Sequence, residues 1–260
     1  MDPPVQPVVF PTRVGMDRNS ANSTTASPSF PHPRGDGPLV AFFTGMEIKF
    51  SPPAWGWTEP EFDFGTNAFS DAINDTTFPY LSSNLDFSGD AGISARYQET
   101  VAVGGLEEAS SVAKKIVPSC VVTKGTEKIG LVGVTTQVLE SISSTGGVEV
   151  KGFAGDGLET NDMALLASQV QPVINDLKSQ GVNKIVLMAH LQQIAFEQAL
   201  APLLTDVDIV LAAGSNTRLG DSNDVAAAFI GHAADFAGNY PIYTAGADGR
   251  PTVIVNTDNE

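Results

Sequence analysis

The sequence predicts an α/β fold, and the second half of the chain carries the pattern that predicts it. Residues 184–189 predict a buried strand that is apolar after Lys184 and ends at His190, and residues 207–213 predict a second buried strand that is apolar apart from Asp208. Between them, residues 192–204 have the apolar spacing of a helix. A strand, a helix and another strand at this spacing form a right-handed crossover, so the two strands are predicted to be parallel.

Residues 161–180 predict a longer helix. Their apolar positions recur with a helical period, and Gly181 follows as a C-terminal cap. The other predicted elements are a helix at 66–75, a strand at 78–85, a hairpin at 118–124 and 127–134, and a hairpin at 241–244 and 252–257.

The composition excludes several classes of partner. The 260 residues include 14 Lys and Arg against 30 Asp and Glu, a net charge of −16. Nucleic acids and anionic membranes require basic patches, so we expect neither as the main partner. Cys120 is the only cysteine and cannot form an internal disulfide. We also expect no membrane span and no signal peptide, and no feature indicates an oligomeric state.

Residues 1–59 contain three segments that a single DNA unit can encode. The string TTTTCCCCACCCGCGTGGGGATGGACCG gives residues 10–18 from its third base, 30–38 from its second and 50–59 from its first. Counted along the coding sequence, the three copies recur with a constant period of 61 nucleotides. The unit also contains CCCCAC and GTGGGG, which are reverse complements.

A short palindromic unit at a fixed period, with unlike sequence between its copies, resembles a translated bacterial CRISPR repeat array. Residues 1–59 also hold most of the prolines and almost no periodic apolar pattern. We therefore predict that 1–59 is a disordered segment that was not selected as protein. The folded domain is predicted to cover residues 60–260.

Polar residues follow both predicted parallel strands. The first strand ends at His190, and the second runs into Gly214-Ser215-Asn216-Thr217. In open α/β sheets, ligands bind beyond the carboxyl ends of parallel strands, so this edge is the predicted site. Simpler interpretations exist, because a histidine at the end of an apolar strand is often structural, and Gly214 and Asn216 both favour turns.

Segments spread along the chain share the order of motifs found in one family. They are Glu-Phe-Asp-Phe-Gly at 61–65, Phe-Pro-Tyr-Leu-Ser-Ser-Asn-Leu-Asp at 78–86, Lys-Ile-Gly-Leu-Val-Gly-Val-Thr-Thr at 128–136, Ala-His-Leu at 189–191, Ala-Ala-Gly-Ser-Asn-Thr at 212–217, and the strands at 240–256. Together they resemble the calcineurin-like metallophosphoesterases, specifically the 5′-nucleotidase branch. The resemblance covers about residues 61–260.

This resemblance implies a four-layer αββα sandwich, of which the chain would lack the N-terminal strands. It implies a hydrolase that acts on nucleotides or related phosphomonoesters, located in the periplasm or outside the cell. In this family, two divalent ions such as Zn²⁺ or Mn²⁺ share a bridging carboxylate and generate a hydroxide nucleophile.

When the family's site residues are matched to this sequence one by one, few of them are present. His190 matches the family's lone metal-binding histidine, and Asn216 matches the last ligand, where an amide oxygen can bind a metal weakly. Asp63 matches the aspartate that pairs with the catalytic histidine, although alone it would be a turn or helix-start acid. Glu59 and Pro60 stand at the positions of a ligand asparagine and of the catalytic histidine.

The substituted positions argue against catalysis. Gly214 stands where the family has a further histidine ligand, and a proline at position 60 has no group that could protonate a leaving group. Two dispersed neutral ligands do not hold a dinuclear centre. We therefore expect a phosphoesterase fragment with little or no activity. The alternative is a non-catalytic product of a truncated or rearranged gene with no selected function.

Overall fold

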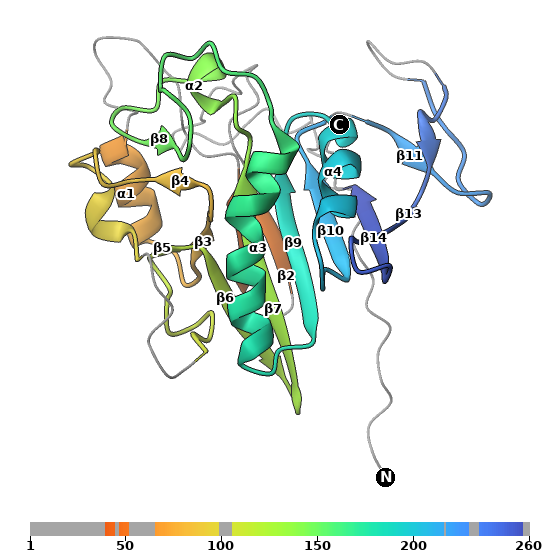
Figure 1. Cartoon of the computed structure of the whole chain (residues 1–260), viewed down its shortest axis with the longest axis horizontal. Helices are drawn as coiled ribbons and strands as arrows, with labels where there is room; N and C mark the ends of the chain where they lie inside the picture. The colour runs from red at the N-terminus through yellow and green to blue at the C-terminus, as the bar shows by residue number, and fades with distance from the viewer. Residues whose placement is uncertain are drawn as a thin grey trace, which may run out of the picture.

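A six-stranded sheet forms the centre of the structure, in the order β13-β14-β10-β9-β7-β6 (Figure 1). The computed structural model describes residues 40–44, 47–51, 66–98, 106–215, 217–228 and 234–256. The strands of this sheet are β6 (Ser119–Lys124), β7 (Glu127–Thr135), β9 (Lys184–His190), β10 (Ile209–Ala213), β13 (Ile242–Ala245) and β14 (Pro251–Asn256). The predicted α/β class is confirmed.

The four middle strands of the sheet are parallel. β7 pairs with β9, β9 with β10 and β10 with β14, while β6 and β13 run antiparallel at the two edges. The chain crosses from β9 to β10 through α4 (Ile194–Leu200) and the 3₁₀ turn η2 (Ala201–Leu203). The predicted crossover and both predicted hairpins are therefore present.

Helices α3 (Met163–Ser179) and α4 cover one face of this sheet (Figure 1). The Asp162 side chain accepts a hydrogen bond from the Leu165 amide at 3.0 Å and caps the start of α3. Gly181, with φ of 87°, follows its end, as predicted. The buried residues of α3 recur every three or four positions and pack against β7, β9 and β10; they include Leu166, Val170, Ile174 and Leu177.

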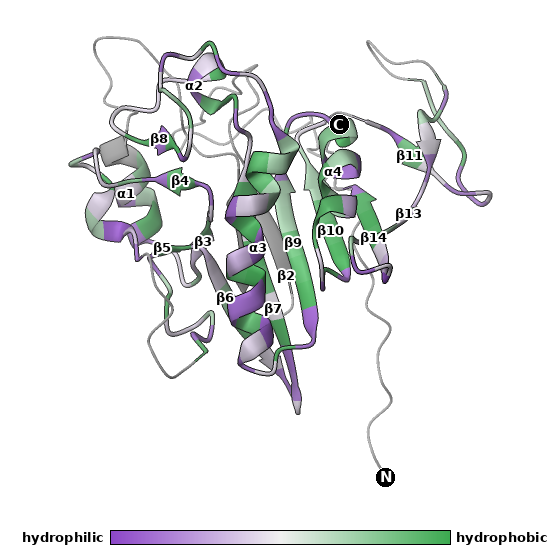
Figure 2. Ribbon diagram, viewed as in Figure 1, coloured by the Kyte–Doolittle hydropathy of each residue, from purple (hydrophilic) through white to green (hydrophobic). Residues whose placement is uncertain are grey.

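Hydropathy follows this layering. The central strands are mainly hydrophobic, whereas α3 carries both hydrophobic and hydrophilic residues (Figure 2). Such a distribution is typical of a buried parallel sheet covered by amphipathic helices. Within the part of the chain that the structure describes, no helix is both long and apolar enough to cross a membrane.

Two strands lie within the segment that was predicted to be disordered. β1 (Val40–Thr44) and β2 (Glu47–Ser51) pair antiparallel, and β1 lies close to β3 (Tyr80–Leu81), β7 and β9. Residues 40–43 form an apolar run and residues 47–51 alternate in polarity, both of which favour strands. The sequence did not predict these two strands, and the remainder of 1–59 lies outside the described residues.

A second core forms beside the sheet from short elements. They are α1 (Thr66–Asn74), β3, β4 (Leu85–Asp86), β5 (Ile116–Val117), α2 (Leu139–Ile142) and β8 (Glu149–Val150), and the 3₁₀ turn η1 (Ser94–Arg96) directly follows Ile93 of this core. β3 pairs parallel with β5, and β4 pairs antiparallel with β8. The predicted helix at 66–75 is thus confirmed, but the predicted strand at 78–85 is reduced to β3 and β4. A further short parallel pair is β11 (Leu219–Gly220) with β12 (Gly238–Asn239).

Side-chain hydrogen bonds explain the interruption between β3 and β4. The Ser83 hydroxyl donates to the Gly133 carbonyl oxygen at 2.6 Å, and the Ser83 backbone N–H donates to the same oxygen at 2.9 Å. The Asn84 side chain pairs with the backbone of Thr135, because Nδ2 donates to its carbonyl at 2.8 Å and Oδ1 accepts from its amide at 2.9 Å. The Asn84 amide therefore takes the place of a neighbouring strand at the end of β7.

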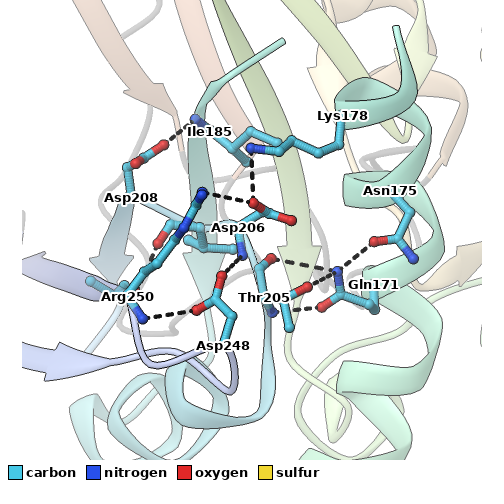
Figure 3. Close-up of polar contacts among 11 residues, drawn as sticks. Gln171, Asn175, Lys178, Ile185, Thr205, Asp206, Asp208, Asp248 and Arg250 are labelled. Atoms are coloured by element: carbon cyan, nitrogen blue, oxygen red, sulfur yellow. Dashed lines mark hydrogen bonds and ion pairs between the residues drawn. The ribbon is translucent and has the colours of Figure 1, made fainter. Parts of the chain in front are cut away.

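A polar network joins α3, the start of β10 and the β13–β14 turn at the amino end of the parallel strands (Figure 3). Asp206 accepts ion pairs from Lys178 at 2.8 Å and from Arg250 at 3.1 Å, and its amide donates to Asp248 at 3.0 Å. Beside it, the Gln171 side chain bonds to both the amide and the hydroxyl of Thr205. This network ties three separate segments together at the edge opposite His190.

We predict that Gly133→Ala destabilises the domain. A Cβ at Gly133 would lie 2.3 Å from the Leu81 carbonyl oxygen, and backbone atoms cannot move away as a flexible side chain can. The expected loss is roughly 2 kcal/mol of unfolding free energy, measured by urea denaturation. Gly238→Ala is the control, because its Cβ would meet only a Leu219 methyl at 3.4 Å. Equal stability of the two variants would contradict the role given to Gly133.

Candidate functional site

The pairing of the parallel strands brings four strand ends to one edge of the sheet. Thr135 at the end of β7 is in register with His190 at the end of β9, and His190 is in register with Ala213 at the end of β10. Asn256 at the end of β14 is in register with Ala212. This edge has the position at which parallel α/β sheets bind ligands.

The His190 imidazole is buried at this edge, with 5% of the residue exposed. Burial lowers the pKa of His190 from 6.5 to about 4, because the charged form loses its solvation. The ring is therefore neutral near pH 7. Its Nε2 lies 3.3 Å from the Gln192 side-chain nitrogen, and its Nδ1 has no hydrogen-bond partner among the described residues.

Gly214 lies directly against this ring. A Cβ built on Gly214 would be 2.4 Å from His190 Nε2, and Gly214 has φ of 83°, a conformation that L-residues rarely adopt. The imidazole thus occupies the space that any side chain at position 214 would need. Gly214 does more than lack a ligand atom, because it makes room for the present position of His190.

A layer of buried hydroxyl and amide groups lies next to His190. The Ser82 and Thr135 hydroxyl oxygens are 3.1 Å apart, and the side chain of Asn84 holds both backbone groups of Thr135. These side chains satisfy one another, as buried polar groups must. The layer consists of neutral hydrogen-bonding groups and carries no carboxylate.

A buried carboxyl group lies behind the edge. Glu197 in the first turn of α4 is 0% exposed, and its Oε1 accepts a hydrogen bond from the Leu191 amide at 3.1 Å. Burial raises the pKa of Glu197 from 4.5 to about 8, so it is mainly protonated at pH 7. Leu191 directly follows His190 in the chain.

Of the three predicted site residues, the structure describes one. His190 lies at the predicted edge, whereas Asp63 and Asn216 lie outside the described residues. Within the described ranges, no three His, Cys, Asp or Glu side chains lie close enough together to hold a metal ion. The described part of the edge therefore contributes one imidazole and does not fit a dinuclear metal centre.

Two features of this site were missed from the sequence. Glu197 was overlooked, although it lies three, four and seven residues before the buried Leu200, Ala201 and Leu204 and thus falls within their apolar stripe. The pairing of Asn84 with Thr135 joins residues 51 positions apart, and no local pattern indicates it.

Comparison with known proteins finds relatives that share one name, 5′-nucleotidase. The chain is 27% identical over 226 residues to a snake venom 5′-nucleotidase from Crotalus adamanteus, in an alignment covering 82% of this chain and 31% of that protein. It is 26% identical over 220 residues to the human 5′-nucleotidase, covering 84% and 32%. A solved structure of a 5′-nucleotidase precursor from Thermus thermophilus matches with a TM-score of 0.53 at 24% identity, covering 75% of this chain and 31% of that one.

The chain is 5′-nucleotidase-like. The sequence relatives carry this name, and the structural match shows a shared fold. A solved NAD nucleotidase from Haemophilus influenzae also matches, with a TM-score of 0.50 at 21% identity. No protein-family model matches the chain. The chain spans about a third of the length of the curated relatives.

The 5′-nucleotidase-like part of the chain extends further towards the N-terminus than the motifs indicated. Residues 61–260 are 200 of the 260 residues, and an alignment that covers 84% of the chain cannot fit within them. The likeness therefore reaches into the last part of residues 1–60. Strands β1 and β2 lie in the same part of the chain.

We predict that Gly214→Ala displaces the His190 ring. The displaced ring gains solvent, so the pKa of His190 should rise from about 4 towards 6.5 in an NMR titration of metal-free protein. Gly249→Ala is the matched control, because Gly249 has a similar φ of 77° but nothing within 4 Å of the added Cβ. The same pKa of His190 in both variants would contradict this prediction.

Proposed function

We propose that this chain carries part of a metal-dependent phosphoester hydrolase of the 5′-nucleotidase type, and that the chain alone has little or no activity. The substrates of the complete site would be nucleotides or related phosphomonoesters. The observation that carries the proposal is the sheet edge itself, where His190 ends the strand that the family resemblance assigns to a metal-binding histidine. The 5′-nucleotidase names of the relatives support the substrate class.

The metal requirement is the reason to expect low activity. A dinuclear site that binds Zn²⁺ or Mn²⁺ needs several imidazoles and carboxylates around both ions. The described residues offer His190 alone, and its Nε2 already faces the Gln192 amide. Asn216 could add one neutral oxygen, which is too little for a second ion.

The loss of proton transfer to the leaving group is a second, independent reason to expect low activity. In the family a histidine protonates the leaving group, with help from the aspartate that Asp63 matches. At the matching position Pro60 has no proton to give, and Asp63 is left without an imidazole to orient. Loss of a general acid typically slows catalysis by about 10²- to 10⁴-fold, so a bound metal would not restore normal rates by itself.

The same resemblance supports residues 60–260 as a partial catalytic domain and a periplasmic or extracellular location. Three of the relatives are named as venom proteins, which fits an extracellular role for this class. The excess of acidic residues is compatible with this setting.

The three-frame repeat in residues 1–59 favours the second candidate function, a rearranged gene product without selected function. Sequencing of genomic DNA across codon 60 in long reads tests it. An uninterrupted nucleotidase gene on both sides of that codon would exclude it.

We predict no measurable phosphate release from AMP or from a chromogenic phosphate ester, with Mn²⁺ or Zn²⁺ added. The rate of the full chain should equal that of His190→Ala within error, because His190 alone cannot assemble the catalytic metals. Malachite green detection of phosphate is the measurement. Metal-dependent turnover by the full chain that His190→Ala abolishes would overturn the prediction of inactivity while supporting the nucleotidase assignment.

A further inference from the structure

Glu197 is an unusual residue for its position. It belongs to the first turn of α4, is 0% exposed, and shares its helix face with the fully buried Leu200 and Ala201. Glutamate side chains are rarely buried to this extent unless they are paired. An apolar side chain would fill the same space without the cost of removing a carboxyl group from water.

The contacts of Glu197 are few and specific. Oε1 accepts the Leu191 amide at 3.1 Å, and Oε2 has no hydrogen-bond partner among the described residues. The ion pairs found in the described part of the chain join Lys178 and Arg250 to Asp206 and Lys184 to Glu127, so none involves Glu197. Among the described residues, the Leu191 amide is therefore the hydrogen-bond donor from outside α4 that contacts this carboxyl group.

That contact holds the turn between His190 and α4. Gln192 in this turn has φ of 73°, which costs free energy for a residue with a side chain. Gln193 precedes the first residue of α4 but makes no side-chain cap bond. The turn is short and strained, and the Glu197–Leu191 hydrogen bond connects its start to the first turn of the helix.

We propose that Glu197 is a positioning residue that fixes the His190 imidazole through the Leu191 amide. The hydrogen bond holds Leu191 and so sets where β9 ends, which in turn places the ring against Gly214. This inference deepens the proposed function, because His190 is the ligand-type residue of that edge. Its test reads the conformation of the ring and does not depend on activity.

Stability and positioning lead to different expectations for Glu197→Leu. Leucine removes one hydrogen bond but also removes the burial of a carboxyl group, so the net change in stability should be small. A positioning role predicts instead a local change at Leu191 and His190. Glu197→Gln keeps an acceptor oxygen at a similar reach and should restore the local structure.

The experiment compares the wild type, Glu197→Gln and Glu197→Leu by NMR in EDTA-treated protein. The readouts are the His190 ring signals, assigned with His190→Asn, and the exchange rate of the Leu191 amide hydrogen. We expect Glu197→Leu to move the ring signals and to speed Leu191 exchange by at least about tenfold, because the amide loses its acceptor. Glu197→Gln should leave both close to wild type.

Glu140→Leu is the matched control, because the Glu140 side chain likewise accepts a backbone amide, that of Val150 at 3.0 Å. It should leave the His190 ring unchanged. Unchanged ring signals in Glu197→Leu would overturn the proposal, as would equal disturbance by Glu197→Gln. If Glu197→Leu does not fold, Glu197→Asp takes its place in the experiment. Its shorter side chain keeps the carboxyl group but withdraws it from the Leu191 amide, so the same change in the His190 ring signals is expected.

Discussion

The register of four parallel strands organises both the main core and the candidate site. Pairing of β7, β9, β10 and β14 fixes Thr135, His190, Ala213 and Asn256 as strand ends at one edge. A shift by one residue would turn every side chain to the other face of the sheet and expose the residues that now pack under α3 and α4. The packing of the main core and the position of the candidate site therefore both follow from the register of these strands. The Asp206 network stabilises the opposite edge, where β10 starts and the β13–β14 turn lies.

At the candidate edge, several described neutral groups contact one another. Asn84 occupies both backbone groups of Thr135, Gln192 faces His190, and the His190 ring occupies the space beside Gly214. Among the described residues of this edge, His190 provides the imidazole, and no three His, Cys, Asp or Glu side chains gather there to hold a metal ion. The likeness to 5′-nucleotidases lies in the sequence and the fold, and it is compatible with the reduced ligand set that we propose for this edge.

Sequence periodicity predicted the long helices and strands, whose patterns lie within a single continuous segment of the chain. The spacing of Leu166, Val170 and Ile174 predicted α3, because a helical period indicates burial of one helix face. The apolar run to His190 predicted β9, because a continuous apolar run indicates a strand that is buried on both faces. The Ser82–Asn84 interruption, the closeness of His190 to Gly214 and the burial of Glu197 arise from contacts between distant segments. The strands β1 and β2 were missed because the DNA repeat argued against structure throughout residues 1–59, although residues 40–43 and 47–51 have strand patterns of their own.

We propose that the edge around His190 cannot hold two metal ions, and the number of metal ions bound per chain is the measurement that can show otherwise. The full chain should be stripped with EDTA, incubated with Zn²⁺ or Mn²⁺, dialysed, and measured by elemental analysis beside His190→Ala. We expect at most one weakly held ion per chain, lost in His190→Ala, because one imidazole with a neutral oxygen gives low affinity. Two ions per chain retained through dialysis would contradict it.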